Sequence, residues 1–239
     1  MADPNTPSDP PLALADWDED RRLRLIGRNG SGIADALYAS LLPDAPDVDP
    51  VGDVTATGDH VLNPDFATFN AAETLKPAAV LIAVDHAQSD PVVTLTVRTA
   101  NLSAHAGQIA FPGGRMDAGE SPRETAVREA EDEVALPRQA VDVQGYLPPY
   151  LSRTGYRVFP VVGRLDTTPV LTPNPGEVET IFQVPLRFLL DPANAQLESR
   201  VFQGKRRYFY LYQFANHAIW GLTAGIIHHM SVRLLSADL

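Results

Sequence analysis

The chain has 239 residues, of which 44% are hydrophobic, and a formal net charge of −11 at pH 7. This length allows one large domain, or one domain with an appendage, around an ample core. The acidic balance argues against binding to a nucleic-acid backbone, and the absence of cysteine excludes disulfide bonds and thiol chemistry.

The first residues lack the basic and apolar regions of a secretory signal. No run approaches the roughly 18 consecutive apolar residues that a membrane-spanning helix needs. We therefore expect a cytoplasmic protein with no segment in a membrane.

The N-terminal part is predicted to be an appendage. Residues 1–15 are rich in proline and aspartate, which predicts disorder. Helix is expected within residues 17–42, and a linker punctuated by proline, aspartate and glycine from 44 to about 70. The helical face follows a Gly-Ser-Gly break and contains Ile33, Leu37 and Leu41. We thus divide the chain into an N-terminal helical extension with its linker (16–70) and a main domain (71–239).

Two strands are predicted at the start of the main domain. Ala78–Val84 and Val92–Val97 are rich in β-branched and apolar residues, and a turn rich in aspartate and serine separates them. A long loop then leads to a helix with clear starting signals. Ser121 and Glu124 have the spacing of a capping box, and Pro122 occupies the first helical position.

This helix carries three acids on one side. Because an α-helix turns by about 100° per residue, Glu129, Asp132 and Glu133 lie on one face, within reach of a common ion. The opposite side is apolar and consists of Ala126, Val127, Ala130 and Val134. Carboxylates suit Mg²⁺ or Mn²⁺, although a solvated acidic face would show the same pattern.

The rest of the chain alternates strands with short helices. We expect strands at Val143–Leu147, Tyr156–Leu165 and Glu177–Val184, a short helix from Pro185 to Leu190, and a hairpin formed by Glu198–Gln203 and Arg207–Phe214. The last helix presents Leu222, Ile226, Met230 and Leu234 on one face. This mixture predicts an α/β fold.

The stretch from Gly114 to Leu136 resembles the Nudix box. The residues in register with that motif are Gly114, Glu120, Arg128, Glu129, Glu133 and Leu136. Three positions depart from it. Ala130 is small where the family has a bulky apolar residue, Asp132 replaces a glutamate, and Ala135 replaces a glycine. The last change costs about 1 kcal/mol if the position needs a positive φ.

A second motif runs directly into the box. It consists of Leu95-Thr-Val-Arg98, His105-Ala-Gly-Gln108 and Phe111-Pro-Gly-Gly-Arg115. This combination is similar to the signature of the coenzyme A pyrophosphatase branch of Nudix hydrolases. Ile219-Trp220-Gly221-Leu-Thr223 resembles a C-terminal signature of the same branch, in which we expect Trp220 to pack the last helix rather than to stack on a ligand.

The resemblance implies the Nudix α/β/α sandwich with a mixed sheet. It implies divalent-metal-dependent hydrolysis of the pyrophosphate of coenzyme A or a derivative to 3′,5′-ADP and 4′-phosphopantetheine or its acyl form. The implied metal ligands are Glu129, Asp132, Glu133 and the carbonyl of Gly114, with Mg²⁺ or Mn²⁺ as the ion. The implied partner is a small molecule, not a nucleic acid or a membrane, and a homodimer is compatible with the family.

The resemblance also implies roles for residues outside the metal site. Glu120 and Arg128 are expected to pair and to hold the loop against the helix. Glu177 is a candidate general base and Glu179 a second one, the alternative being two surface acids.

Cationic and hydrogen-bonding side chains are candidates to bind the substrate: Arg98, His105, Gln108 and Arg115. Alternatively, Arg98 is a surface partner of a nearby acid and His105 stabilises the loop.

Two other functions stay open. One is a Nudix hydrolase for a different diphosphate, such as ADP-ribose or NADH. The other is a Nudix-fold ligand-binding module without activity, which the substitutions Asp132 and Ala135 would allow.

Overall fold

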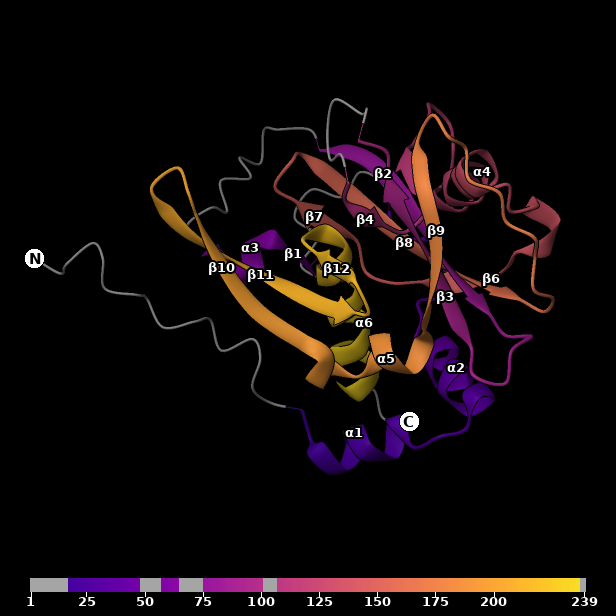
Figure 1. Cartoon of the computed structure of the whole chain (residues 1–239), viewed down its shortest axis with the longest axis horizontal. Coiled ribbons are helices and arrows are strands. Elements are labelled where there is room, and N and C mark those ends of the chain that lie inside the picture. Colours follow the sequence, from indigo (N-terminus) through magenta and orange to yellow (C-terminus); the bar gives the residue numbers. More distant parts are fainter. Residues whose placement is uncertain (1–16, 48–56, 65–74, 101–106, 237–239) are drawn as a thin grey trace, which may run out of the picture.

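The structure is a computed structural model that describes residues 17–47, 57–64, 75–100 and 107–236 (Figure 1). Its main sheet contains β1 (Thr57–Gly58), β2 (Lys76–Asp85), β3 (Val92–Arg98), β4 (Ile109–Ala110), β5 (Gly113–Arg115), β6 (Asp142–Tyr146), β7 (Tyr150–Ser152), β8 (Tyr156–Leu165) and β9 (Val178–Pro185). The strand order is β1-β7-β8-β2-β3-β4, while β5, β6 and β9 pair with β2, β8 and β3.

The sheet is mixed, as predicted. β2 and β8 run parallel from Lys76 opposite Tyr156 to Asp85 opposite Leu165, whereas β3 pairs antiparallel with both β2 and β9. The predicted strand Tyr156–Leu165 has the observed bounds, and the other predicted strands of this sheet differ by one or two residues at their ends.

Helices cover both faces of the main sheet (Figure 1). They are α1 (Glu19–Ile26), α2 (Gly30–Ala39), α3 (Asp59–Leu62), α4 (Pro122–Val134), α5 (Leu186–Leu190) and α6 (Leu222–Ser236). Successive side chains of a strand alternate between faces. Ala79, Leu81 and Ala83 of β2 therefore pack with α4, whereas Ile82 and Val84 join a second cluster with α2, α5 and α6. The expected three-layer α/β/α sandwich is confirmed.

A smaller sheet packs beside α6. It contains β10 (Ala195–Phe202), β11 (Lys205–Phe214) and β12 (His217–Trp220) in that order. Tyr210, Tyr212 and Ile219 bury one of its faces in the cluster that contains α6. The predicted hairpin is confirmed, although its turn is tighter than expected and lies at Gln203 and Gly204, both with positive φ.

The N-terminal helical region differs from the prediction in one detail. The Gly-Ser-Gly segment does not interrupt the helix but begins α2, because the Asn29 side chain accepts the N–H of Gly32 at 2.8 Å as an N-cap. A Cβ on Gly30 would lie 2.0 Å from the carbonyl oxygen of Ser89, so this glycine allows the turn after β2 to approach α2. The predicted disorder of residues 1–15 lies outside the described residues.

Residues 57–62, within the predicted linker, form secondary structure. Strand β1 pairs with β7, and α3 follows directly. Asp59 of α3 accepts hydrogen bonds from the Tyr150 hydroxyl at 3.0 Å and from Arg207 at 3.0 Å. These long-range contacts have no signature in the local sequence. Among the described residues, no helix has the length and apolar character needed to cross a membrane.

Candidate active site

Helix α4 carries the predicted acidic face, and local interactions set both of its ends. The Ser121 hydroxyl accepts the N–H of Glu124 at 3.3 Å, and the Glu124 carboxylate accepts the N–H of Ser121 at 2.8 Å. The predicted capping box is thus present. At the other end, Ala135 adopts the left-handed conformation with φ of 56°. The strain expected where the family has glycine is therefore also present.

Glu120 and Arg128 form the predicted pair, which joins the loop to the helix. Nε and Nη2 of Arg128 donate to the two carboxylate oxygens of Glu120 at 2.6 and 2.9 Å, and Thr125 Oγ1 donates at 2.7 Å. These hydrogen bonds, first of all that from Arg128, lower the pKa of Glu120 to about 2. Glu120 is therefore ionised at neutral pH and anchors the loop.

Glu129 lies against the glycine turn. Nη1 of Arg128 donates to Glu129 Oε1 at 2.8 Å, and the Glu129 side chain is 17% exposed. A Cβ on Gly114 would lie 2.5 Å from the Glu129 carboxyl carbon, so only glycine lets the turn approach this carboxylate so closely. Burial raises the pKa of Glu129, whereas the hydrogen bond and charge of Arg128 oppose this increase. The charges of Glu177 and Asp132 raise it further.

Glu133 is the most buried acid of the helix, with a side chain that is 3% exposed. The N–H of Gly113 donates to its Oε2 at 3.2 Å, and Nη1 of Arg98 lies 3.5 Å from its Oε1. Burial raises the pKa of Glu133 to about 7 against the opposing effects of these two groups. The carboxylates of Glu129 and Glu177 add to the increase.

The three acids of the helix are not gathered around one point. Asp132 is 54% exposed and lies 3.6 Å from Arg128, which also contacts Glu129. Across the described part of the chain, no three His, Cys, Asp or Glu side chains form a group that could hold a metal ion. In this arrangement the three carboxylates face different partners, so their role as ligands of one ion stays a prediction. Arg128 engages two of them, while Glu133 turns toward the glycine turn.

The donor chemistry nevertheless fits a divalent cation. Glu133 is buried and Glu129 is partly buried. The charges of Glu129 and Glu177 raise the pKa of Glu133, and the charge of Glu177 also raises the pKa of Glu129. Buried carboxylates that repel one another favour a hard cation between them, because it neutralises charge that protein and solvent leave uncompensated.

Asn174 is a residue that the sequence analysis missed. Its N–H donates to the carbonyl of Glu133 at 2.8 Å, and its Nδ2 donates to the carbonyl of Asp132 at 3.3 Å. Its own carbonyl accepts the N–H of Glu177 at 3.0 Å. Asn174 thus caps the C-terminal end of α4 and connects it to Glu177. The Asn-Pro-Gly sequence signals a turn but does not reveal which helix the turn caps.

The candidate substrate ligands are only partly brought together. Arg98 ends β3 beside the acidic group, and the carbonyl of Gln108 accepts its N–H at 2.9 Å. Arg115 ends β5 and is exposed. Glu179 is exposed as well. His105 lies outside the described residues.

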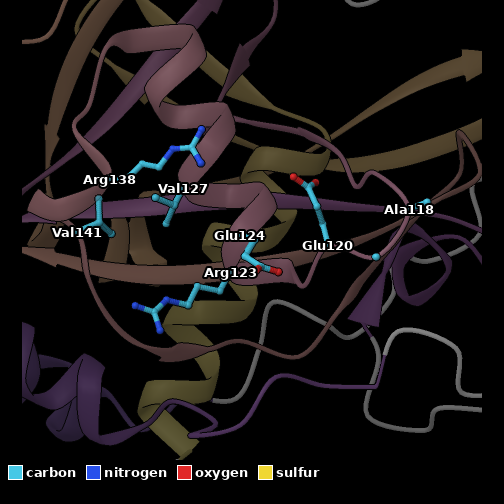
Figure 2. Close-up of a pocket in the computed structure, with 8 residues that line it drawn as sticks. Ala118, Glu120, Arg123, Glu124, Val127, Arg138 and Val141 are labelled. Carbon is cyan, nitrogen blue, oxygen red and sulfur yellow. The ribbon is translucent and has the colours of Figure 1, made fainter.

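An open pocket of about 500 Å³ lies beside the first half of α4 (Figure 2). It is lined by Ala118, Gly119, Glu120, Arg123, Glu124, Val127, Arg138 and Val141. Of the candidate site residues it contains Glu120 but neither Glu129 nor Glu133. We therefore locate the candidate site at the buried acids and the glycine turn, and not in this pocket.

Comparison with known proteins identifies the family. The family described as NUDIX domain matches residues 75–205. The chain is 47% identical over 157 residues to the uncharacterized Nudix hydrolase NudL of Photorhabdus laumondii, an alignment that covers 64% of this chain and 82% of that protein. It is 39% identical over 168 residues to the NudL protein of Pectobacterium atrosepticum, covering 66% and 83%.

A solved structure is also similar. RenU, a Nudix hydrolase from M. Smegmatis, matches with 25% identity and a TM-score of 0.40, covering 46% of this chain and 71% of that one. The family match spans more than half of the chain, and the relatives are covered over most of their length. The chain therefore belongs to the Nudix hydrolase family.

Proposed function

We propose that this chain hydrolyses the pyrophosphate of coenzyme A or a coenzyme A derivative, releasing 3′,5′-ADP and 4′-phosphopantetheine or its acyl form. Membership in the Nudix family supports a nucleoside diphosphate derivative as the substrate class. The observation that carries the finer proposal is the contact of 3.5 Å between Arg98 and Glu133. It brings the motif that resembles the coenzyme A branch to the buried acids of the Nudix box.

We expect the reaction to need Mg²⁺ or Mn²⁺. Glu129 and Glu133 would hold the ion, with Asp132 in support and the carbonyl of Gly114 as a further oxygen ligand. When bound, such an ion neutralises charge on the pyrophosphate oxygens and lowers the pKa of a water molecule. Since a carboxylate must be ionised to ligate, the raised pKa of Glu133, about 7, makes binding weaker in acid.

Other residues of this chain would bind the substrate and move the proton. Coenzyme A carries a 3′-phosphate besides its pyrophosphate, and guanidinium groups such as those of Arg98 and Arg115 bind phosphate oxygens through paired donors. His105 and Gln108 would add hydrogen bonds. Glu177 lies close enough to raise the pKa of Glu129 and Glu133, which supports it as the base that takes the proton of the attacking water.

The test is a comparison of four substrates with each metal. Coenzyme A, dephospho-coenzyme A, ADP-ribose and NADH are incubated with the protein and Mg²⁺ or Mn²⁺, and the products are separated by chromatography. The variant is Glu133→Gln. The matched control is Glu131→Gln, which changes an acid on the same helix that pairs with Arg138 at 2.5 Å and is 40% exposed.

Formation of 3′,5′-ADP from coenzyme A by the wild type and by Glu131→Gln, but not by Glu133→Gln, would support the proposal. Turnover of ADP-ribose or NADH alone would keep the hydrolase and refute the coenzyme A substrate. Binding of coenzyme A without turnover under both metals would indicate an inactive binding module.

A further inference from the structure

β10 is the free edge of the three-stranded sheet. It pairs with β11 without a bulge, from Ala195 opposite Tyr212 to Phe202 opposite Lys205, and contains neither proline nor glycine. Among the described strands, none pairs with its other side. Figure 1 shows the β10–β11 hairpin extending away from the main sheet. A long, regular edge of this kind offers unpaired N–H and C=O groups to another strand.

On the side of the sheet opposite β10, the backbone groups of β11 have partners. Where β11 continues beyond its last pair with β12, the side chain of Asn63 takes the place of a neighbouring strand. Asn63 Oδ1 accepts the N–H of Tyr208 at 2.8 Å, and Nδ2 donates to the Tyr208 carbonyl at 3.0 Å. The fold thus covers backbone groups on that side of β11, and within the described residues no such cover protects β10.

The side chains of β10 are complementary to their own copy. If two β10 strands pair antiparallel with Ser199 opposite itself, Glu198 lies opposite Arg200 of the second copy, and Leu197 lies opposite Val201 of the second copy. A two-fold axis repeats each contact. Opposite charges and apolar side chains that face each other directly stabilise antiparallel strands.

The charges also select this register. Moving the two-fold axis by one residue along the strand, to Glu198 or to Arg200, would place two like charges opposite each other. Only the axis at Ser199 pairs each of these charges with its opposite while keeping the outer faces of both sheets on the same side.

Exposed apolar side chains lie on both faces at the outer end of β10. Val201 is 72% exposed and Phe202 is 44% exposed, both at the outer end of β10. The Arg200 guanidinium lies 5.7 Å from the ring of Phe209 and 5.6 Å from that of Trp220, whose rings are 5.9 Å apart. These aromatic contacts hold Arg200 on the outer face, where the proposed cross-strand contact needs it.

We propose that two copies of this chain form a two-fold dimer in which their β10 strands pair antiparallel about Ser199. The two three-stranded sheets then become one continuous sheet. This inference concerns assembly and does not depend on the proposed hydrolysis.

The first test uses the absence of cysteine from the natural chain. In Ser199→Cys, each new thiol faces its own copy across the axis, so mild oxidation is expected to convert most of the protein to a covalent dimer on a non-reducing gel. Gln196→Cys is the matched control on the same strand, because its cysteine would face Phe202 of the second copy. Absence of a cross-link in Ser199→Cys, or equal cross-linking of both variants, would overturn the proposal.

The second test reverses the charges. At about 0.15 M salt, which screens repulsion between the acidic chains beyond roughly 8 Å, light scattering should give the wild type twice the chain mass of 25.9 kDa. Glu198→Arg and Arg200→Glu alone should each shift the protein to the monomer mass, and the double variant should restore the dimer. Arg24→Glu, an exposed change on α1, should have no effect. A monomeric wild type, or a dimer in both single variants, would refute the interface.

Discussion

Arg98 Nη1 lies 3.5 Å from Glu133 Oε1 and connects the end of β3 to the last turn of α4. The two residues come from different sequence motifs, and neither motif reveals the contact. The Glu133 carboxylate is nearly inaccessible, while the Arg98 side chain is 25% exposed. An ion at Glu133 would therefore compete with Arg98 for the same carboxylate and leave the guanidinium available for a phosphate.

Glu133→Gln should stabilise the metal-free protein at high pH. Burial raises the pKa of Glu133 from its ordinary 4.5 to about 7, so ionising it costs stability that grows as pH rises from 4.5 and is complete above 7. The variant lacks this cost and should unfold at a higher urea concentration. Its free energy of unfolding should exceed that of the wild type by about 1–3 kcal/mol at pH 8, and by less at pH 5.

Urea unfolding of both proteins at the two pH values measures this effect, with Glu131→Gln, a change of a more exposed acid on the same helix, as the control. Added Mg²⁺ or Mn²⁺ should raise the melting temperature of the wild type and not that of Glu133→Gln. An equal advantage of Glu133→Gln at pH 5 and pH 8 would contradict the assigned cause.

Glu120→Gln should show the opposite dependence. The pKa of Glu120 is lowered from 4.5 to about 2, so its stabilisation is fully present above pH 4.5 and is lost as pH falls toward 2. The variant is expected to lose about 1–3 kcal/mol at pH 6, and the difference from wild type should shrink steadily below pH 4.5. Acid titration followed by circular dichroism measures the difference, and a gap that stays constant down to pH 3 would exclude the ion pair with Arg128 as its source.

Gly114→Ala should reduce activity more than stability. The new Cβ would lie 2.5 Å from the Glu129 carboxyl carbon, so this carboxylate has to move away from the turn. Moving a candidate metal ligand by about 1 Å is costly for catalysis. We therefore expect kcat/KM to fall by about tenfold or more. Thermal unfolding should change little, since the carboxylate is the mobile end of a side chain. Unchanged kcat/KM would show that the position of Glu129 is not critical.

Asn174→Ala should disturb Glu177 through the backbone turn. The variant loses the hydrogen bond from Nδ2 to the Asp132 carbonyl and that from the Gly176 N–H to Oδ1 at 3.1 Å. We expect a loss of about 1–2 kcal/mol in stability and an altered pH profile of kcat. Asn174→Asp keeps the acceptor for Gly176 and should recover part of the wild-type profile. If both variants lose stability but keep the profile, Asn174 has only a structural role.

Ala135→Gly should stabilise the protein. Ala135 has φ of 56°, a conformation that glycine adopts without steric strain, and it ends α4. The expected gain is about 0.5–1 kcal/mol in urea unfolding, reduced in part by the greater freedom of glycine in the unfolded chain. A loss of stability would mean that the methyl group of Ala135 makes contacts that outweigh the strain.

The elements that could be predicted from the sequence are those with a strong local pattern. Tyr156–Leu165 is rich in apolar residues, and α4 has a capping box, so both were predicted with the observed start. The short strands β5, β7 and β12 were not predicted. They contain only a few residues, and what makes them strands is pairing with distant segments, such as Gly113–Arg115 opposite Ala78–Val80.

The family resemblance, the order of the main elements and the spacing of the acids along α4 can all be read from local sequence patterns, because they depend on periodicity and on residues a few positions apart. The environment of each acid, in contrast, depends on how distant parts of the chain pack together. Glu133 is buried against Gly113 and Arg98, while Asp132, one residue earlier, is 54% exposed. Burial and pKa depend on what packs against each side of a helix, and those neighbours come from strands and turns far away in the chain.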